Sequence, residues 1–254
     1  MALWDLKNKK ALVTGGSKGI GKAVVSELLE LGAEVVFTAR DGKGVEQAIS
    51  QFSERRSQVH GLTADVTDIG QRRQIKEWID GRWGKLDIVV NNAGINIRKP
   101  SNEYSSEEYR RVVDTDMIAP FELSRELFEL LSKSGRASVI NVASIAGIMD
   151  AQTGAPYGMA KAGLIQLSRN LACEWARSNI RVNAVSPWFT QTPATQSLLS
   201  NPEKLRLIVS RTPMGRVATD EEIAGAVAFL AMDKASFITG QNLIVDGGGT
   251  SSIF

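Results

Sequence analysis

The chain has 254 residues and a formal net charge of +2, which is too small to indicate binding to nucleic acid or to a membrane surface. Hydrophobic residues make up 43% and charged residues 23%, as in ordinary globular proteins. One cysteine, Cys173, cannot form an internal disulfide, and one His with one Cys argues against a metal site. The amino terminus carries early charges, and no stretch approaches the ~20 apolar residues of a membrane span. We therefore expect a cytoplasmic protein without a signal peptide.

Short apolar runs predict seven β-strands, at residues 10–14, 34–38, 59–63, 87–91, 138–142, 180–186 and 242–245. Helical patterns lie between them, at residues 20–31, 45–55, from 67 onward, 106–132, 157–178 and 220–232. An irregular segment between the last two helices holds Pro187, Pro193, Pro202 and Pro213. This alternation predicts a doubly wound α/β fold, with a parallel sheet covered by helices on both faces. Ligands of such folds bind at the carboxyl ends of the strands, where Thr14, Asn92, Ser144 and Pro187 are expected.

A glycine-rich turn follows the first strand and opens a helix. Its backbone could approach a pyrophosphate closely, and the helix N-terminus would supply free N–H groups. Its spacing is Gly-x3-Gly-x-Gly rather than the usual Gly-x-Gly-x-x-Gly, and a glycine turn after a strand can also be only a turn. The candidate cofactor-binding residues here are Gly15, Ser17, Lys18, Gly19, Ile20 and Gly21.

Arg40 follows the second strand, where a guanidinium would accommodate the 2′-phosphate of NADP. Lys18 adds a second positive charge, so NADP is favoured over NAD. Asp41 leaves ribose-hydroxyl recognition open, and both residues could simply be solvated. Asp65, after the third strand, could bind adenine or cap a turn.

The segment from Ser144 to Lys161 carries the candidate chemistry. Tyr157 and Lys161 are one helical turn apart, so their side chains share a face. An ammonium beside a phenol favours the phenolate, which makes the phenol usable as a general acid or base. Ser144 can join them only if the fold brings it back to this helix.

Five motifs in register carry a resemblance over essentially the whole chain. Thr14-Gly-x3-Gly-Ile-Gly21, Asn91-Asn-Ala-Gly94, Ser144, Tyr157-x3-Lys161 and Pro187 resemble the short-chain dehydrogenase/reductase family. The segments 171–176, 179–183, 212–216 and 238–241 resemble its NADP-dependent tropinone-reductase-like branch. The resemblance implies a single-domain Rossmann fold over residues 1–254, with the seven-stranded order 3-2-1-4-5-6-7.

The resemblance also implies roles. Tyr157 would exchange a proton with the substrate oxygen, Lys161 would assist it and hold the nicotinamide ribose, and Ser144 would bond that oxygen. The implied cofactor contacts include Asp65, Val66, Asn92, Ala93, Gly94, Tyr157, Lys161, Pro187, Thr190 and Thr192. The expected activity is hydride transfer between NADP(H) and a small or cyclic ketone or secondary alcohol.

Two positions depart from the family pattern. Asp116 stands where the family usually has Asn, whose main-chain carbonyl serves a proton relay. Pro120 cannot donate to the carbonyl of Asp116, so we expect a helix kink there and a surviving relay. The alternative is an impaired member, acting as a nucleotide-binding sensor or scaffold. Trp188 stands where the family usually has Gly, and its ring could line the substrate pocket or pack outward.

The substrate side is less defined. Apolar residues near strand ends suggest an apolar pocket with a mobile lid, with Arg98 and Gln152 as candidates to orient a polar group. A 3-oxoacyl carrier-protein reductase is a second enzymatic possibility, for which Arg98 and Lys99 are the candidate basic residues. The resemblance further implies a homotetramer or homodimer, assembled through the two long helices and the last strand.

Overall fold

The computed structural model describes residues 4–252, apart from the side chain of Ser53. Residues 1–3 and 253–254, which the expected domain range includes, lie outside the described part. The strands are β1 (Lys10–Thr14), β2 (Glu34–Ala39), β3 (Val59–Thr63), β4 (Ile88–Asn91), β5 (Ala137–Val142), β6 (Ile180–Pro187) and β7 (Asn242–Val245). They form one parallel sheet in the order β3-β2-β1-β4-β5-β6-β7, which confirms the expected topology.

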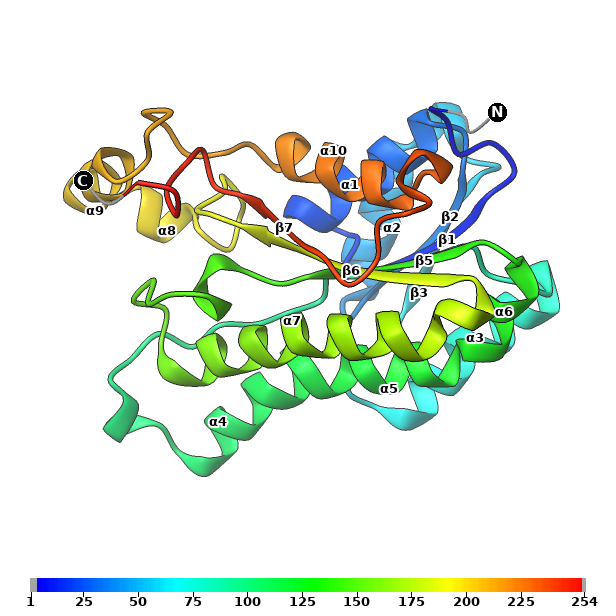
Figure 1. Cartoon of the computed structure of the whole chain (residues 1–254), viewed down its shortest axis with the longest axis horizontal. Coiled ribbons are helices and arrows are strands. Elements are labelled where there is room, and N and C mark those ends of the chain that lie inside the picture. Colours follow the sequence, from blue (N-terminus) through cyan, green and yellow to red (C-terminus); the bar gives the residue numbers. More distant parts are fainter. Residues whose placement is uncertain (1–3, 253–254) are drawn as a thin grey trace.

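Helices cover both faces of this sheet (Figure 1). The helices are α1 (Gly19–Glu30), α2 (Gly42–Gln51), α3 (Ile69–Trp83), α4 (Ser106–Val113), α5 (Ala119–Glu126), α6 (Phe128–Ser134), α7 (Ala155–Trp175), α8 (Gln196–Leu199), α9 (Pro202–Ser210) and α10 (Asp220–Ala231). Helices α1 and α10 pack on one face, and α3, α5, α6 and α7 pack on the other. Because both faces are covered, central strands such as β4 are buried at every position.

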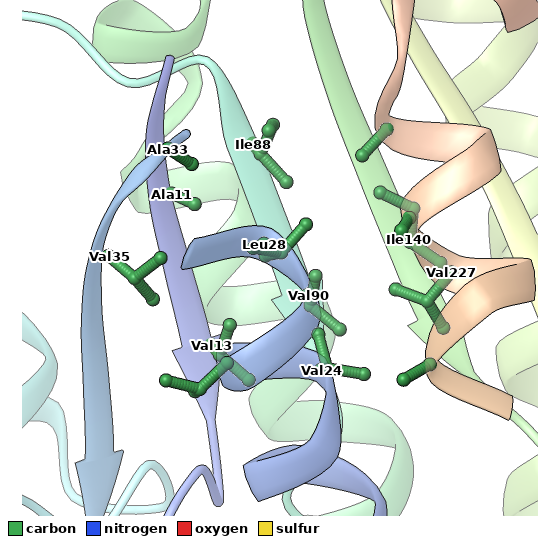
Figure 2. Packing of buried hydrophobic residues seen from close by; sticks show 14 of the residues in the cluster. Ala11, Val13, Val24, Leu28, Ala33, Val35, Ile88, Val90, Ile140 and Val227 are labelled. Carbon is green, nitrogen blue, oxygen red and sulfur yellow. The ribbon is translucent and has the colours of Figure 1, made fainter. Parts of the chain in front are cut away.

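The core beneath α1 and α10 consists mainly of Val, Leu, Ile and Ala side chains (Figure 2). Val24 and Leu28 of α1 pack over Val13 and Val90 of the sheet, and all four are inaccessible to solvent. Burying one such side chain contributes about 1.5–3 kcal/mol. This packing fixes α1, and therefore the glycine turn that precedes it, over the carboxyl ends of β1 and β4.

The expected helical stretch at residues 106–132 is confirmed, but it is not one regular α-helix. It is divided into α4, a π-helical turn η3 (Asp114–Ile118), α5 and α6. Pro120 lies in the first turn of α5, and its missing N–H cannot bond the carbonyl of Asp116. The helix irregularity expected at Asp116 takes the form of this π-helical turn.

Other boundaries also differ from the sequence expectation, and local caps explain the following two. Helix α2 begins at Gly42 instead of residue 45, because the Asp41 carboxylate accepts a hydrogen bond from the Lys43 N–H at 3.2 Å and caps the helix. The segment expected to be irregular contains α8 and α9. Asn201 caps α9 and Pro202 occupies its first turn, a position that proline tolerates.

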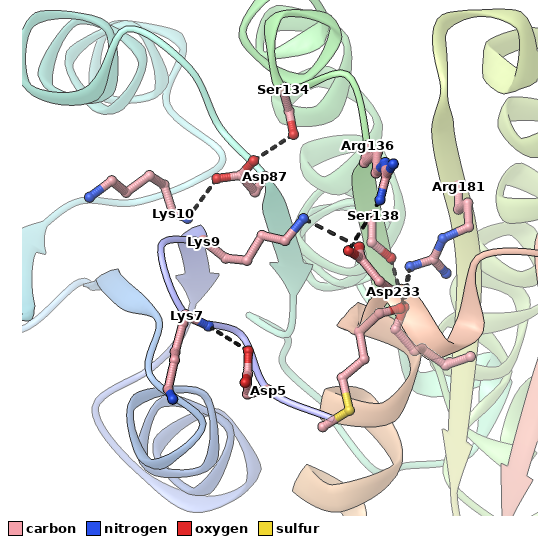
Figure 3. Close-up of polar contacts among 12 residues, drawn as sticks. Asp5, Lys7, Lys9, Lys10, Asp87, Ser134, Arg136, Ser138, Arg181 and Asp233 are labelled. Atoms are coloured by element: carbon pink, nitrogen blue, oxygen red, sulfur yellow. Dashed lines mark hydrogen bonds and ion pairs between the residues drawn. The ribbon is translucent and has the colours of Figure 1, made fainter. Parts of the chain in front are cut away.

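The amino-terminal edge of the sheet carries a separate polar network (Figure 3). The buried Asp87 accepts hydrogen bonds from the Lys10 N–H at 2.8 Å and the Ser134 hydroxyl at 2.5 Å. Lys9 pairs with Asp233 at 3.3 Å beside a hollow of about 350 Å³. This hollow lies at the edge opposite the strand ends where the candidate catalytic residues gather.

Candidate active site

The glycine turn between β1 and α1 is shaped by close backbone approach. Gly15 and Gly19 have φ angles of +68° and +53°, which disfavour residues with a side chain. A Cβ on Gly21 would lie 2.3 Å from the carbonyl oxygen of Gly15 and 2.4 Å from Nδ2 of Asn92. Lys18 is the N-cap residue of α1, and its side chain makes no capping hydrogen bond. The backbone N–H groups in the first turn of α1 therefore have no side-chain cap from Lys18. Such a helix start suits a phosphate group.

Hydrogen bonds join the ends of β1 and β4. The side-chain amide of Asn92 donates to the carbonyl oxygens of Thr14 at 2.9 Å and Gly15 at 3.2 Å. In return, the N–H groups of Asn92 and Ala93 both donate to the Thr14 hydroxyl at 3.0 Å. Asn92 therefore fixes the start of the glycine turn relative to the end of β4. Gly94, two residues later, is exposed.

Lys161 and Asp116 form a buried ion pair, with Lys161 Nζ 3.2 Å from Asp116 Oδ2. Asp116 is 0% exposed and Lys161 is 4% exposed. The ammonium also donates to the Val142 carbonyl at 3.0 Å, and Asp116 Oδ1 accepts from the Ile95 N–H at 2.8 Å. A Cβ on Gly94 would lie 2.9 Å from Asp116 Oδ2, so the glycine leaves room for the pair.

Electrostatics favour the charged form of Lys161. Burial opposes its charge, but Asp116, with Tyr157, outweighs burial and raises the pKa of Lys161 above its ordinary value. Burial likewise raises the pKa of Asp116, against the opposing effects of Lys161 and the Ile95 N–H. The pair consists of an Asp116 carboxylate and a Lys161 ammonium, because a neutral Asp116 would leave the buried ammonium without a counter-ion.

Tyr157 and Ser144 are brought to this pair by α7 and by the turn after β5. Lys161 Nζ lies 5.5 Å from the centroid of the Tyr157 ring. Ser144 starts the short helix η4 (Ile145–Gly147), and its hydroxyl accepts from the Ala146 N–H at 3.1 Å. A Cβ on Gly147 would lie 2.7 Å from the carbonyl carbon of Lys161, so η4 packs directly on α7. The fold therefore returns Ser144 to the helix that carries the other two residues.

The other candidate cofactor residues surround the same strand ends. Arg40 is exposed just after β2. The Asp65 carboxylate accepts from the Thr67 N–H at 2.9 Å and the Thr67 hydroxyl at 2.7 Å, which is the turn-capping alternative. Val66, immediately after it, is buried in the core on the α3 side of the sheet.

The segment after β6 approaches the glycine turn. A Cβ on Gly19 would lie 3.2 Å from the Cβ of Thr192. Thr195 accepts from the Thr192 N–H at 3.1 Å and donates to the Thr190 carbonyl at 2.5 Å, which fixes this loop. Pro187, buried at the end of β6, begins the loop. Two segments that carry expected cofactor-binding residues therefore approach each other closely at this point.

Sequence analysis missed a buried chain of hydrogen bonds beneath the site. The side-chain amide of Asn91 donates to Ser124 at 3.0 Å and to Asn141 at 2.8 Å, and Asn141 donates to Ser168 at 2.8 Å. The chain joins α5, which directly follows the turn η3 that carries Asp116, and α7, which carries Lys161, to strands β4 and β5. The signal available in the sequence was an Asn in each of two strands that are buried at every position.

Comparison with known proteins agrees with this arrangement. Residues 15–250 match the family described as enoyl-(acyl carrier protein) reductase. A tropinone reductase homolog of Arabidopsis thaliana is 43% identical over 252 residues, which cover 99% of this chain and 96% of the relative. A second tropinone reductase homolog from the same plant is also 43% identical over 252 residues, with the same coverage.

Solved structures show the same fold. A putative gluconate dehydrogenase from Agrobacterium tumefaciens superimposes with a TM-score of 0.96 at 32% identity, covering 100% of both chains. A gluconate 5-dehydrogenase from Burkholderia cenocepacia, solved in complex with NADP and tartrate, gives a TM-score of 0.93 at 28% identity and covers 98% of both chains.

The fold and the residues at its strand ends define an oxidoreductase of the Rossmann type. The chain belongs to the short-chain dehydrogenase/reductase family, and its relatives place it among the tropinone-reductase-like members. Within residues 4–252, no helix is both long and apolar enough to cross a membrane.

Proposed function

We propose that the protein is an NADP(H)-dependent carbonyl reductase or alcohol dehydrogenase acting on a small or cyclic ketone or its secondary alcohol. The observation that carries the proposal is the set of Tyr157, Lys161 and Ser144 at one edge of the sheet. Within this set, a charged Lys161 is held beside the Tyr157 ring by Asp116 and the Val142 carbonyl.

The residues present fit a dinucleotide. Positive φ angles at Gly15 and Gly19, and the uncapped start of α1, leave backbone donors for a pyrophosphate. Support for NADP comes from the exposed Arg40 just after β2, since a guanidinium there would suit a 2′-phosphate, and from the solved structure of one gluconate 5-dehydrogenase relative, which names NADP. When bound, the cofactor would supply or accept the hydride.

The chain's own residues would handle the proton and the substrate oxygen. Ser144 would donate a hydrogen bond to the carbonyl oxygen and orient it. Tyr157 would donate its phenolic proton to that oxygen as negative charge develops, and would accept a proton in the reverse direction. Lys161 would stabilise the phenolate that remains and hold the nicotinamide ribose. Gly94, exposed next to the ion pair, would leave space for the ribose.

An apolar substrate is favoured by the side chains that follow Ser144. Ile148 is 46% exposed and Met149 is 42% exposed, although both are large and hydrophobic. Arg98 and Lys99 are the candidate basic residues for binding a carrier protein. Lys99 forms an ion pair with Glu108, so only Arg98 of these two is both exposed and outside that pair. This arrangement supports a small ketone over an acyl carrier-protein substrate. Because two similar solved structures are described as gluconate dehydrogenases, sugar acids are included in the test for comparison with the ketones.

The test is NADPH oxidation with a panel of cyclic ketones, 3-oxoacyl thioesters and keto-gluconates. We expect turnover with ketones, and loss of about 10²–10⁴-fold in rate for Tyr157→Phe, which removes the proton donor. Tyr109→Phe, in a tyrosine on α4, is the matched control and should keep the full rate. Full activity in Tyr157→Phe would refute the mechanism. Tight NADPH binding without turnover across the panel would instead support the sensor or scaffold alternative.

We also propose that the whole chain is one domain, located in the cytoplasm, which assembles as a homotetramer or homodimer. Support for assembly comes from exposed apolar residues at the edge strand: Leu243 and Ile244 of β7 are 36% and 39% exposed, and the nearby Phe237 is fully exposed. Light scattering coupled to size-exclusion chromatography would measure the mass, and a monomer would overturn the assembly proposal.

A further inference from the structure

The side chain of Asp116, and not only its main chain, takes part in the candidate active site. Its carboxylate is fully buried in the π-helical turn η3, with one oxygen on the Ile95 N–H at 2.8 Å and the other 3.2 Å from Lys161 Nζ. The ammonium is directed away from solvent and bonds the Val142 carbonyl at 3.0 Å. Lys161 therefore has a fixed counter-ion within the protein itself.

A buried ammonium needs one nearby negative charge, and two groups here can supply it. One is the Asp116 carboxylate. The other is the phenol of Tyr157 on α7, whose ring centroid is 5.5 Å from Lys161 Nζ, once it has lost its proton. The other hydrogen bonds of the pair are to uncharged groups: Lys161 donates to the Val142 carbonyl from β5, and Asp116 accepts from the Ile95 N–H after β4.

We propose that Asp116 is a positioning residue that supplies the counter-ion of Lys161, so that Tyr157 keeps its proton to higher pH than it would beside an unpaired ammonium. The inference rests on the proposed function, since it assigns the tuning of the same proton donor. The ion pair presents no net charge to the phenol, whereas an unpaired ammonium would draw the phenol toward ionisation.

The consequence is a shifted working range of pH. Carbonyl reduction requires the protonated phenol, and alcohol oxidation requires the phenolate. With Asp116 ionised, reduction persists to higher pH, and oxidation begins only at higher pH. Both limits must move together, because one proton on one residue controls them.

The main test compares the pH profiles of kcat/KM for both directions in the wild type and in Asp116→Asn. The amide keeps the size of the side chain and its acceptor for the Ile95 N–H, but it removes the charge. We expect both limits to move to lower pH by about 1–3 units, because only the phenolate can then balance Lys161. Unchanged limits, or a shift to higher pH, would overturn the proposal.

Asp114→Asn is the matched control, because Asp114 lies on the same π-helical turn, carries the same charge and is exposed. Asp114→Asn should leave both pH limits in place. A shift equal to that of Asp116→Asn would show that the loss of any nearby negative charge moves the limits, and this would contradict a specific role of Asp116. Asp116→Ser removes the charge with a smaller group and must shift the limits in the same direction as Asp116→Asn.

A second readout does not depend on turnover. The ultraviolet absorbance of the phenolate, taken as the difference from Tyr157→Phe in the same background, reports ionisation of Tyr157 directly. In Asp116→Asn this signal should develop at lower pH than in the wild type, and superimposable titrations would refute the role of Asp116. If no ketone or alcohol is turned over, the proposed function fails while this titration still decides the tuning.

Discussion

The indole N–H of Trp188 donates a hydrogen bond to the Thr212 hydroxyl, with Nε1 and Oγ1 2.9 Å apart. Thr212 is buried, and its hydroxyl donates in turn to the Ile208 carbonyl of α9 at 2.8 Å. The Trp188 ring also meets Phe189 edge-on, with the centroids 4.7 Å apart. The large residue that replaces the family's usual glycine therefore ties the end of β6 to the end of α9.

Trp188→Phe should weaken substrate binding more than chemistry. The change leaves the Thr212 hydroxyl without its donor, which costs about 0.5–1.5 kcal/mol, and it frees α9 beside the proposed substrate pocket. We expect KM for the ketone to rise about 2–10-fold with kcat changed by less than about 2-fold. Steady-state kinetics at saturating NADPH measure this split. Trp78→Phe, at the distant β3 edge, should alter neither parameter, and a fall in kcat alone for Trp188→Phe would contradict the positioning role.

Arg40→Ala should reduce NADPH binding selectively. Loss of a charged hydrogen bond to the 2′-phosphate costs about 1.5–3 kcal/mol, so the Kd for NADPH should rise about 10–100-fold while the Kd for NADH stays within about 2-fold. Fluorescence titration of both cofactors measures the two constants. Arg56→Ala, an exposed arginine before β3, is the control and should leave both constants unchanged. Equal weakening of both cofactors would show that Arg40 does not read the 2′-phosphate.

The periodic elements of this protein could be predicted from sequence, because buried strands such as β4 and the glycine turn are local patterns. The kink at Asp116 was also local, since Pro120 removes a specific hydrogen bond four residues back. The Asp116–Lys161 pair could not be predicted, because it depends on how far η3 and α7 approach each other across Gly94. The Trp188–Thr212 hydrogen bond could not be predicted either. Its prediction would require the backbone path between β6 and α10, and the sequence of that segment has no periodic pattern.

Gly21→Ala and Gly81→Ala form a matched pair that separates close packing from helix propensity. Both glycines lie in helices, but a Cβ at Gly21 would meet the Gly15 carbonyl oxygen at 2.3 Å, whereas one at Gly81 would meet nothing within 4 Å. We expect Gly81→Ala to stabilise the fold by up to about 1 kcal/mol. Gly21→Ala should destabilise it by about 1–3 kcal/mol, because backbone must shift, and should also weaken cofactor binding. Urea unfolding measures both, and similar changes in the two variants would refute the packing argument.

Glu34 connects the stability of the fold to pH at the β2–β3 edge. Burial would raise the pKa of its carboxyl, but hydrogen bonds from Lys10, from Trp83 at 3.0 Å and from His60 at 2.9 Å outweigh burial and lower the pKa from 4.5 to about 2. Because the pKa is lower in the folded state, the carboxylate stabilises the fold fully above pH 4.5 and loses this contribution as the pH falls toward 2. The full shift corresponds to about 3 kcal/mol, and solvent screening at this partly exposed edge reduces the contribution to about 1–2 kcal/mol.

Glu34→Gln should therefore reduce the unfolding free energy at about pH 7 and make it less sensitive to acid. Between about pH 7 and pH 3, the wild type should lose about 1–2 kcal/mol more stability than the variant, as measured by urea unfolding at each pH. Glu46→Gln, in an exposed carboxylate on α2, is the control and should follow the wild-type curve. Parallel curves for the wild type and Glu34→Gln would contradict the assignment, because the hydrogen bonds from Lys10, Trp83 and His60 would then not favour the ionised carboxylate.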